Sequence, residues 1–380
     1  MTRAVALVDG EHYAPVVRDA LAALPYEWVG AILVGGTEKL REGADWGTPL
    51  RDDFGDAEVV VDLSDEPVLG PAARLRWAAK ALAAGLPYVG ADFRFDPPRF
   101  EPFALPSIGV IGTGKRVGKT AVTTHLARLL ARDREVVVVA MGRGGPAEPE
   151  VVETPPSVAD LVARARSGRH AASDHLETAA LAGVPTVGCR RAGGGLAGSV
   201  FVSNVLEGAR VAAGLGPDVV VFDGSGAAIP PVEVDRRVLV TGGGHDLDAY
   251  LNPYRRLISD LVLSVGCDVE GALRCDLRLR PMGDLVGRVA VFTAGPAPVE
   301  HLDADVVHVS TSLADRPALR AELARVEAET YLVEIKAAAI DVVAEHALAA
   351  GARVVFAAND LVGDGVDEAL LALAPAGAPA

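Results

Sequence analysis

Residues Ile108–Thr124 read IGVIGTGKRVGKTAVTT, and this stretch decides the fold of the chain. Its apolar start predicts a buried strand, Gly112–Gly118 a tight turn, and Lys119–Leu130 a helix. In such a turn the backbone N–H groups point inward and the helix N-terminus adds partial positive charge, so phosphate oxygens bind there. The stretch therefore predicts a nucleotide phosphate loop.

Residues of this loop have distinct expected roles. Lys119 is expected to reach the β- and γ-phosphates, and the Thr120 hydroxyl to ligate Mg²⁺. The usual pattern has glycine six residues before the lysine, whereas here that position is Thr113 and glycine lies one place earlier. The expected nucleotide-binding residues are Gly112, Thr113, Gly114, Val117, Gly118, Lys119, Thr120 and Ala121.

A second nucleotide element is Asp218–Pro231, DVVVFDGSGAAIPP. Its apolar run predicts a buried strand that ends at Asp223, where a carboxylate is suited to hold Mg²⁺ directly or through water. Gly224 and Ser225 lie in a turn that lets the backbone approach a substrate closely. Taken alone, an aspartate after a strand is more often an ordinary turn residue.

Basic side chains occur in three glycine-rich turns, which indicates an anionic acceptor. Arginine grips phosphate or carboxylate through paired hydrogen bonds, and glycine exposes backbone donors. The alternative is that these are solvated loop charges. The expected acceptor-binding and catalytic residues are Lys115, Arg116, Arg143, Arg190 and Arg191 with Lys119, and the backbone of Gly193, Gly194 and Gly195 is expected to help bind the substrate.

Two further groups have weaker signals. Glu334, Lys336, Asn359 and Asp360 lie at the ends of late predicted strands, where this class of protein grips the base, and we expect Asn359 and Asp360 to bind nucleotide. The lack of an Asn-Lys-x-Asp motif favours ATP over GTP. Asp9, Glu11 and His12 follow the first predicted strand and are candidate substrate residues, although a lone histidine is more often structural.

Composition limits the partners. The formal charge of −15 disfavours binding to nucleic acid or an acidic membrane surface, so basic residues must gather locally if the substrate is anionic. The three cysteines have no metal or redox spacing, and no run of eighteen apolar residues occurs. We expect a cytoplasmic protein with a small anionic phosphorylated substrate, and leave a homodimer and a K⁺ requirement open.

The chain exceeds the usual size of one hydrophobic core, which predicts two domains. Strand–helix alternation predicts a small Rossmann-like α/β domain over residues 1–102, and a proline-rich stretch around Asp96–Pro106 reads as a linker. Residues 103–380 are predicted to form a larger α/β domain, a doubly wound P-loop NTPase sheet with helices on both faces. Its late elements include strands at 330–335 and 353–357 and a helix at 338–350.

The phosphate loop resembles that of dethiobiotin synthetases, which also begins with Gly-Thr and ends with Val-Gly-Lys-Thr. Those enzymes use ATP to phosphorylate a carboxylate-like group and then close a ring by displacing phosphate. That family tends to carry Thr-Glu where this chain has Lys115 and Arg116, so the resemblance implies a more anionic acceptor here. Asp223-Gly224-Ser225-Gly226 matches the acidic–Gly–small–Gly pattern of the same relatives.

A narrower resemblance covers most of the chain. The combination of Val8–Tyr13, Gly35–Lys39, Gly112–Thr120, Cys189–Gly195 and Asp223–Gly226 resembles the cyclic 2,3-diphosphoglycerate synthetases. That resemblance implies an ATP- and Mg²⁺-dependent ligase that joins the two phosphates of 2,3-bisphosphoglycerate into an intramolecular anhydride, releasing ADP and phosphate. The alternatives are a nucleotide-switch or metallochaperone-type GTPase, and a dethiobiotin-type ligase acting on another anionic acid.

Overall fold

The computed structural model describes residues 1–244 and 246–375, which form two compact units. The first unit consists of Met1–Arg99 together with two later segments, Leu196–Gly198 and Asp246–Ile258, which sequence analysis had placed in the second domain. The second unit holds the remaining described residues. Each unit has its own sheet.

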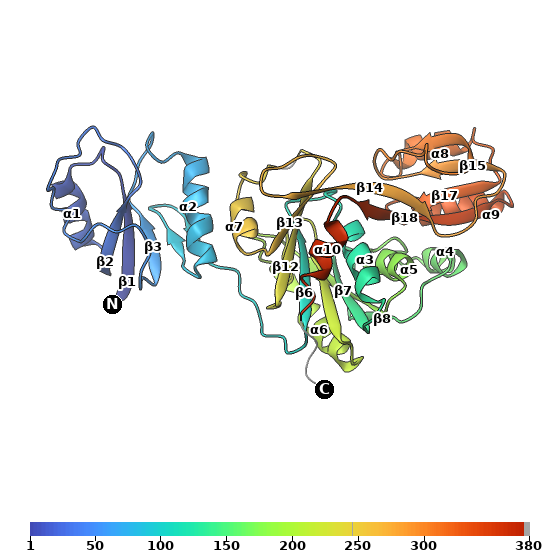
Figure 1. The fold of residues 1–380 in the computed structure, drawn as a ribbon, viewed down its shortest axis with the longest axis horizontal. Coiled ribbons are helices and arrows are strands. Elements are labelled where there is room, and N and C mark those ends of the chain that lie inside the picture. The colour runs from blue at the N-terminus through green and yellow to red at the C-terminus, as the bar shows by residue number, and fades with distance from the viewer. Residues whose placement is uncertain (245, 376–380) are drawn as a thin grey trace. The chain divides into compact units, whose positions relative to one another are not determined.

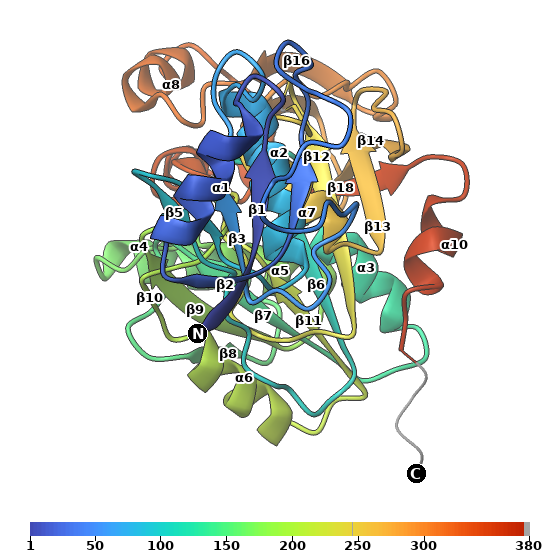
Figure 2. The same cartoon turned by 90° about the vertical axis from the view of Figure 1, so that its left-hand side faces the viewer.

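The N-terminal unit is a small α/β layer structure. Its elements are β1 (Thr2–Val8), α1 (Ala14–Ala23), β2 (Tyr26–Leu33), β3 (Val59–Asp62), α2 (Pro71–Ala83), β4 (Tyr88–Val89), β5 (Arg94–Phe95) and the later α7 (Asn252–Leu257). The sheet order is β2-β1-β3-β4-β5, with parallel pairing except between β4 and β5. The two helices α1 and α2 lie on opposite faces of this sheet (Figures 1 and 2). The predicted Rossmann-like arrangement is therefore present.

The second unit is built on a single large sheet. In the order of the sheet, its path is β10-β9-β7-β11-β6-β12-β13-β14-β18-β17-β15-β16, and β8 pairs with β9. The strands of its first half are β6 (Ser107–Gly112), β7 (Val136–Gly142), β8 (Glu150–Val152), β9 (Thr186–Ala192), β10 (Val202–Ser203), β11 (Val219–Asp223), β12 (Arg236–Gly242) and β13 (Leu261–Val265). The strand before the phosphate loop, β6, pairs in parallel with β11 and β12, so the loop opens at the carboxyl edge of the sheet.

Helices cover both faces of this half of the sheet. They are α3 (Lys119–Leu130), α5 (Asp174–Ala182) and α6 (Val205–Gly214), whereas α4 (Val158–Arg166) packs against the other half of the sheet. Val122, Leu126 and Leu130 of α3 are buried against β6, β11 and β12 in one apolar cluster. Ala209 and Ala212 of α6 pack on the opposite face with Val139 and Phe222. Apolar residues on both sides of each strand explain the near-continuous valine runs.

The other half of the sheet is a C-terminal module attached through a strand that sequence analysis missed. That strand, β14 (Leu273–Pro281), pairs in parallel with β13 and antiparallel with β18 (Arg353–Val362), and Figure 1 shows the two strands joining the phosphate-loop strands to the C-terminal strands. Alternating polar residues in LRCDLRLRP mark a strand exposed on one face, a weaker signal than the valine runs. The other strands of the module are β15 (Arg288–Phe292), β16 (Asp305–Ser310) and β17 (Thr330–Glu334).

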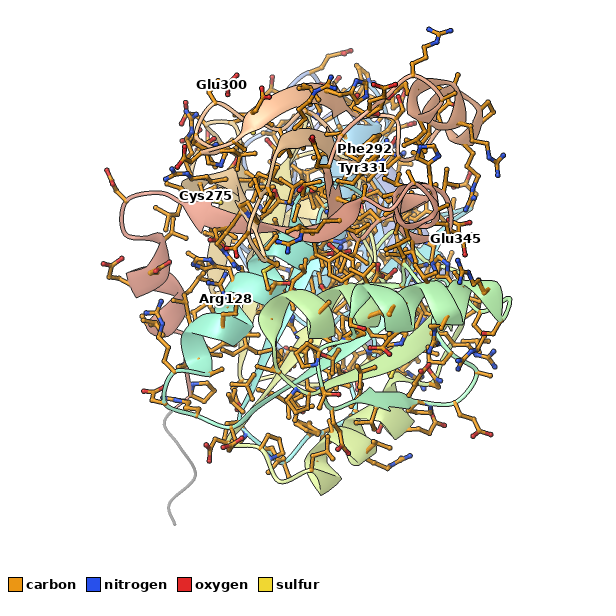
Figure 3. The ribbon with its side chains drawn as sticks, turned by 90° about the vertical axis from the view of Figure 1, so that its right-hand side faces the viewer. Arg128, Cys275, Phe292, Glu300, Tyr331 and Glu345 are labelled. Carbon is orange, nitrogen blue, oxygen red and sulfur yellow. The ribbon has the colours of Figure 1, made fainter. Side chains whose placement is uncertain are left out.

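The C-terminal module packs over α4 and α5. Phe292 and Tyr331 stack with ring centroids 5.8 Å apart and share one core cluster with Leu176 and Leu181 (Figure 3). The helix expected at 338–350 is instead a π-helical segment, Ala339–Ala344, followed by the short α9 (Glu345–Ala349). The remaining helices are α8 (Arg316–Leu323) and α10 (Val366–Leu371).

In the part of the chain that the structure describes, no helix is long and apolar enough to cross a membrane.

One buried histidine fixes the start of α5 against β9. His175 is 2% exposed, and its ring lies where a Cβ on Gly188 would be. Ser173 Oγ lies 3.1 Å from His175 Nδ1, and Glu150 Oε2 lies 3.7 Å from Nε2. Burial lowers the pKa of His175 to about 4, and the nearby Glu150 carboxylate only partly offsets this effect. The imidazole is therefore neutral in the folded protein at neutral pH.

This burial predicts a specific loss of stability in acid. Because the folded pKa lies below the ordinary value of 6.5, the unfolded chain binds more protons between these two pH values, and stability falls as pH drops through that window. The contribution, about 3 kcal/mol, is complete above about pH 6.5 and lost near pH 4. Thermal unfolding of His175→Gln should therefore lose less stability between pH 7.5 and 4.5 than the wild type loses. The exposed His170→Gln serves as control, and an unchanged pH slope in His175→Gln would refute the assignment.

Candidate active site

The phosphate loop needs glycine at position 112 because Lys119 folds back over it. A Cβ built on Gly112 would lie 2.7 Å from Lys119 Cδ and 3.0 Å from Val117 Cγ2. The next residue, Thr113, is anchored instead of free: its N–H donates to Val240 O at 3.0 Å and its hydroxyl to Thr241 Oγ1 at 3.2 Å. The shift of glycine by one position thus fits a loop whose second residue is tied to β12.

The loop presents unused donors at the N-terminus of α3. Gly118 caps the helix in the left-handed region (φ 93°), and Arg116 also has a positive φ of 61°, which is costly for a residue with a side chain. The first turn of α3 contains no acidic residue, and no side chain caps it. The N–H groups of that turn are therefore available to an anion, and the helix dipole favours one.

Asp223 ends β11 beside this loop as a buried carboxylate. It is 2% exposed, and its Oδ1 has no hydrogen-bond partner. Burial raises the pKa of Asp223 to about 7, against the opposing pull of Lys119. Gly224 N–H donates to Val110 O at 2.9 Å, which fixes the end of β11 against β6. A buried, unpaired carboxylate oxygen is costly unless a cation or proton satisfies it, so the predicted metal role of Asp223 fits its environment.

A second carboxylate, Asp174, lies nearby and was missed by sequence analysis. It is the first residue of α5, and a Cβ on Gly142, at the end of β7, would be 3.2 Å from Asp174 Oδ2. Its negative charge acts on both Asp223, whose pKa it raises, and Arg191. Nothing in its sequence context, Ser-Asp-His-Leu, distinguishes it from an ordinary helix start. Only the packing of α5 beside β7 brings it to the site.

Basic side chains from three separate segments meet at the turn after β11. A Cβ built on Gly226 would lie 2.9 Å from Arg143 Nη2, 3.7 Å from Arg191 Nη2 and 3.8 Å from Lys115 Cγ. Burial and the Arg143 charge lower the pKa of Arg191. Arg191 donates to Ser225 O at 2.8 Å and to Gly193 O at 2.7 Å, but its buried Nε has no partner. We call Lys115, Arg143 and Arg191 the basic cluster.

Arg190 is separated from the basic cluster by the pleat of β9. Cys189 is buried, Arg190 exposed and Arg191 half-buried, as expected when successive residues point to opposite faces. The Arg190 N–H donates to Asn204 Oδ1 at 2.7 Å. The expected pair of guanidiniums is thus divided, and only Arg191 lies with Arg143 and Lys115. Arg116 is exposed on the loop, and Gly193, Gly194 and Gly195 are exposed after β9.

Asn359 and Asp360 engage other protein groups. The Asn359 amide donates to Glu334 Oε1 at 2.5 Å. Asp360 accepts from Arg128 at 2.5 Å and from Arg280 at 2.7 Å, and these two arginines lower the pKa of Asp360 despite its burial. Both residues lie on β18. The Asn359 contact joins β18 to β17 within the C-terminal module, whereas the Asp360–Arg128 contact fastens the module to α3.

Asp9, Glu11 and His12 belong to the N-terminal unit, where two of them hold loops in place. Asp9 is fully buried and accepts from the N–H groups of Glu11, His12 and Asp65 and from His12 Nδ1 at 2.8 Å. Burial would raise the pKa of Asp9, but these hydrogen bonds lower it overall. Glu11 accepts from the N–H groups of Thr37 and Glu38. Asp9 therefore joins the loop after β1 to the loop after β3, and Glu11 joins it to the loop after β2.

Models of protein families match three consecutive stretches of the chain. They are the N-terminal domain (residues 3–96), the P-loop domain (107–278) and the C-terminal domain (290–360) of cyclic 2,3-diphosphoglycerate synthetase. The last two divide the region that sequence analysis had treated as one domain, and the break between them begins within β14 and ends in β15.

Curated relatives match over nearly the whole chain. Cyclic 2,3-diphosphoglycerate synthetase of Rubrobacter xylanophilus is 49% identical, covering 98% of this chain and 97% of the relative. The proteins of the same name from Pyrococcus horikoshii and Thermococcus gammatolerans are 39% and 40% identical, covering 93% and 97% of this chain and 91% and 96% of the relatives. Among solved structures, a crystal structure of LpxK from Aquifex aeolicus matches with a TM-score of 0.44 at 14% identity, covering 73% of this chain and 90% of that one. Three family models match the chain, and a curated relative is 49% identical over 98% of it. The chain therefore belongs to the cyclic 2,3-diphosphoglycerate synthetase family.

Proposed function

We propose that the protein uses ATP to convert 2,3-bisphosphoglycerate into cyclic 2,3-diphosphoglycerate, releasing ADP and phosphate. The observation that carries this proposal is the basic cluster, three cationic side chains gathered beside a phosphate loop in a protein with a formal charge of −15. A bisphosphate is the kind of acceptor that needs such local neutralisation. The names of the relatives supply the identity of the acid.

The ATP side of the reaction belongs to the phosphate loop. Donors in the first turn of α3 and the Lys119 ammonium would hold the β- and γ-phosphates, with Thr113 keeping the loop attached to β12. Developing charge on the transferred phosphoryl group would be stabilised by these fixed donors. No proton-abstracting side chain is required, because a phosphate acceptor is already anionic.

The acceptor side belongs to the basic cluster. One substrate phosphate, held by Arg143, Arg191 and Lys115, would attack the γ-phosphorus, breaking its bond to ADP and forming a phosphoanhydride. The second substrate phosphate would then attack the inner phosphorus, which closes the ring and expels the terminal group as inorganic phosphate. Both steps need positioning and charge neutralisation more than covalent help from the protein.

The residues present fit a magnesium ion. Mg²⁺ prefers hard oxygen donors. This part of the site offers the carboxylate of Asp223, whose Oδ1 has no partner, the nearby carboxylate of Asp174 and the hydroxyl of Thr120. The described residues contain no group of three or more acidic, histidine or cysteine side chains placed to hold a metal, which agrees with an ion that also takes oxygens from ATP and water. When bound, the ion would neutralise charge on the β- and γ-phosphates.

The expectations about the nucleotide base, the cellular location, the oligomeric state and the N-terminal residues remain proposals. We retain ATP over GTP because the guanine motif is missing from the sequence. The contacts of Asn359 and Asp360 favour a structural role over base binding. A cytoplasmic location, a homodimer, a K⁺ requirement and substrate contacts of Asp9, Glu11 and His12 stay predictions. A nucleotide-switch protein or a dethiobiotin-type ligase is not favoured, because the family match extends over all three domains.

The function is tested by phosphorus NMR of the enzyme with ATP, Mg²⁺ and 2,3-bisphosphoglycerate. We expect the resonance of a cyclic anhydride to appear together with ADP and phosphate in equal amounts. Lys119→Ala, which removes the charge that faces the β- and γ-phosphates, should lower turnover by orders of magnitude without changing the melting temperature. ADP release without a cyclic product would refute the ring-closing reaction, and near-full activity of Lys119→Ala would remove the loop from it.

The two carboxylates should control the magnesium requirement. Asp223→Asn and Asp174→Asn each remove one negative charge from the metal region, so the Mg²⁺ concentration at half-maximal rate should rise by roughly tenfold or more, equivalent to about 1.4 kcal/mol. Asp218→Asn is a matched control, because Asp218 lies before the other end of β11 and accepts from the Glu135 N–H. If Asp174→Asn titrates like this control, Asp174 is not part of the metal site.

The pleat of β9 should separate the roles of its two arginines. Arg191→Ala should lower kcat/KM for the acceptor by roughly 10- to 150-fold, since a charged hydrogen bond contributes about 1.5–3 kcal/mol. Arg190→Ala should have a much smaller effect, and neither change should alter the KM for ATP strongly. Equal losses in the two variants would show that both side chains reach the acceptor. A loss of ATP affinity alone in Arg191→Ala would assign the basic cluster to the nucleotide.

A further inference from the structure

An ionic triad of two buried carboxylates and a partly exposed lysine joins the C-terminal module to α5. Lys336 Nζ lies 3.5 Å from Glu177 Oε1 and 3.6 Å from Glu334 Oε1. The carboxylate side chains are 7% and 9% exposed, whereas the lysine side chain is 33% exposed. Burial alone would lower the pKa of Lys336, but the two carboxylates outweigh it and raise that pKa, so the ammonium stays charged.

The backbone around Lys336 is held in an unusual conformation. Ala337 has a positive φ of 47°, and the π-helical segment Ala339–Ala344 begins two residues later. Glu334 accepts from the Ala294 N–H at 2.6 Å and from the Asn359 amide, which fixes its carboxylate. Strained residues and π-helical turns persist where the surroundings force them and are frequent at functional sites. The backbone next to Lys336 and one of its two carboxylate partners are thus held in place.

Lys336 also lies beside the start of the phosphate-loop helix. A small cavity, with room for about one water molecule, is lined by Thr120, Ala121, Thr124, Glu177, Leu181, Lys336 and Asn359. The Thr124 hydroxyl is 4% exposed and lacks a hydrogen-bond partner, so this cavity contains an unsatisfied polar group. Lys336 therefore shares a polar cavity with Thr120, which we propose as a metal ligand.

Glu177 connects the triad to the second proposed metal ligand. It follows Asp174 by three residues on α5, so the two side chains lie on one face of the helix, and the charge of Asp174 acts on Glu177. Burial raises the pKa of Glu177 to about 7, while Lys336 acts in the opposite direction. Without the ammonium, two buried carboxylates would face each other beside Asp174.

We propose that Lys336 is a positioning residue of the phosphoryl-transfer site: it clamps Glu177 and Glu334 so that Asp174 and Thr120 are held in the arrangement the metal requires. The C-terminal module would then complete the active site through this contact. This inference rests on the proposed function, since it assigns a role in the same site.

The neighbouring ion pairs of the same interface provide a contrast. Asp360 joins Arg128 of α3 to Arg280 of β14, and thereby fastens the module to the phosphate-loop helix without lining the cavity at Thr120. An ion pair that only holds the module against α3 should change the melting temperature and leave the Mg²⁺ requirement unchanged. The triad should also affect the metal site.

The experiment compares full-length Lys336→Met, Lys336→Arg, Glu177→Gln, the double variant Lys336→Met/Glu177→Gln and the control Arg280→Met. Each variant is measured for melting temperature, for the Mg²⁺ concentration at half-maximal turnover, and for MgATP binding by calorimetry. Lys336→Met should lose at least tenfold in turnover, raise the Mg²⁺ requirement and melt at a lower temperature. Lys336→Arg should recover most of the turnover, because the charge is kept.

The double variant decides between positioning and simple charge neutralisation. The double variant leaves no charge on residue 177, while Glu334 keeps its hydrogen bonds from the Ala294 N–H and the Asn359 amide, so the melting temperature should rise part of the way back toward wild type. The Mg²⁺ requirement should stay raised, because the ionic contact from residue 336 to α5 is still absent. Recovery of both properties in the double variant would overturn the proposal, and so would an equal shift of the Mg²⁺ requirement in Arg280→Met.

The calorimetric arm separates this proposal from the proposed function. If the wild type makes no cyclic anhydride, the proposed reaction fails, but MgATP binding still reports on the metal site. Weakened MgATP binding in Lys336→Met and in the double variant, with wild-type binding in Arg280→Met, would support the positioning role by itself. Unchanged binding in all variants would overturn it.

Discussion

A buried carboxylate oxygen without a partner is the constraint on which the rest of the site depends. Asp223 Oδ1 is sealed at the end of β11, opposite Lys119 and the N-terminus of α3. In a dry interior such a group must be neutralised by a proton or a cation. The phosphate loop, the carboxylates and the basic cluster together form a site of alternating charge in which magnesium and phosphates would complete the balance.

The geometry of parallel strands explains how so many charged groups meet. The strands β6, β7, β9 and β11 are parallel, and their carboxyl ends supply the phosphate loop, Arg143, Arg191 and Asp223 respectively. Hydrogen bonds between these segments, such as Gly224 N–H to Val110 O and the Arg191 side chain to Ser225 O, keep the charged side chains from separating. Neutralising a polyanion requires this rigidity, because flexible cations would lose entropy on binding.

The C-terminal module shows how a second set of strands can serve the same site. It shares a core with α4 and α5 and reaches α3 through Asp360, so its position is fixed by both apolar and ionic contacts. Lys336 then lies beside Thr120, far from it in sequence. The family match to a separate C-terminal domain agrees with this division of the chain.

The sequence by itself determined the phosphate loop, the buried strand ending at Asp223 and the alternation that gives a doubly wound sheet, because those features depend on residues close together in the chain. The sequence also shows that glycine stands at position 112, one place before its usual position. The reason, which is that the Lys119 side chain folds back over Gly112, is visible only in the structure. Only the tertiary structure decided which distant groups meet. It brought Asp174 beside Gly142 and near Asp223, separated Arg190 from Arg191 across the pleat, and tied Asp360 to Arg128. Such pairings depend on how helices pack on a sheet and on strand register, which local patterns do not encode.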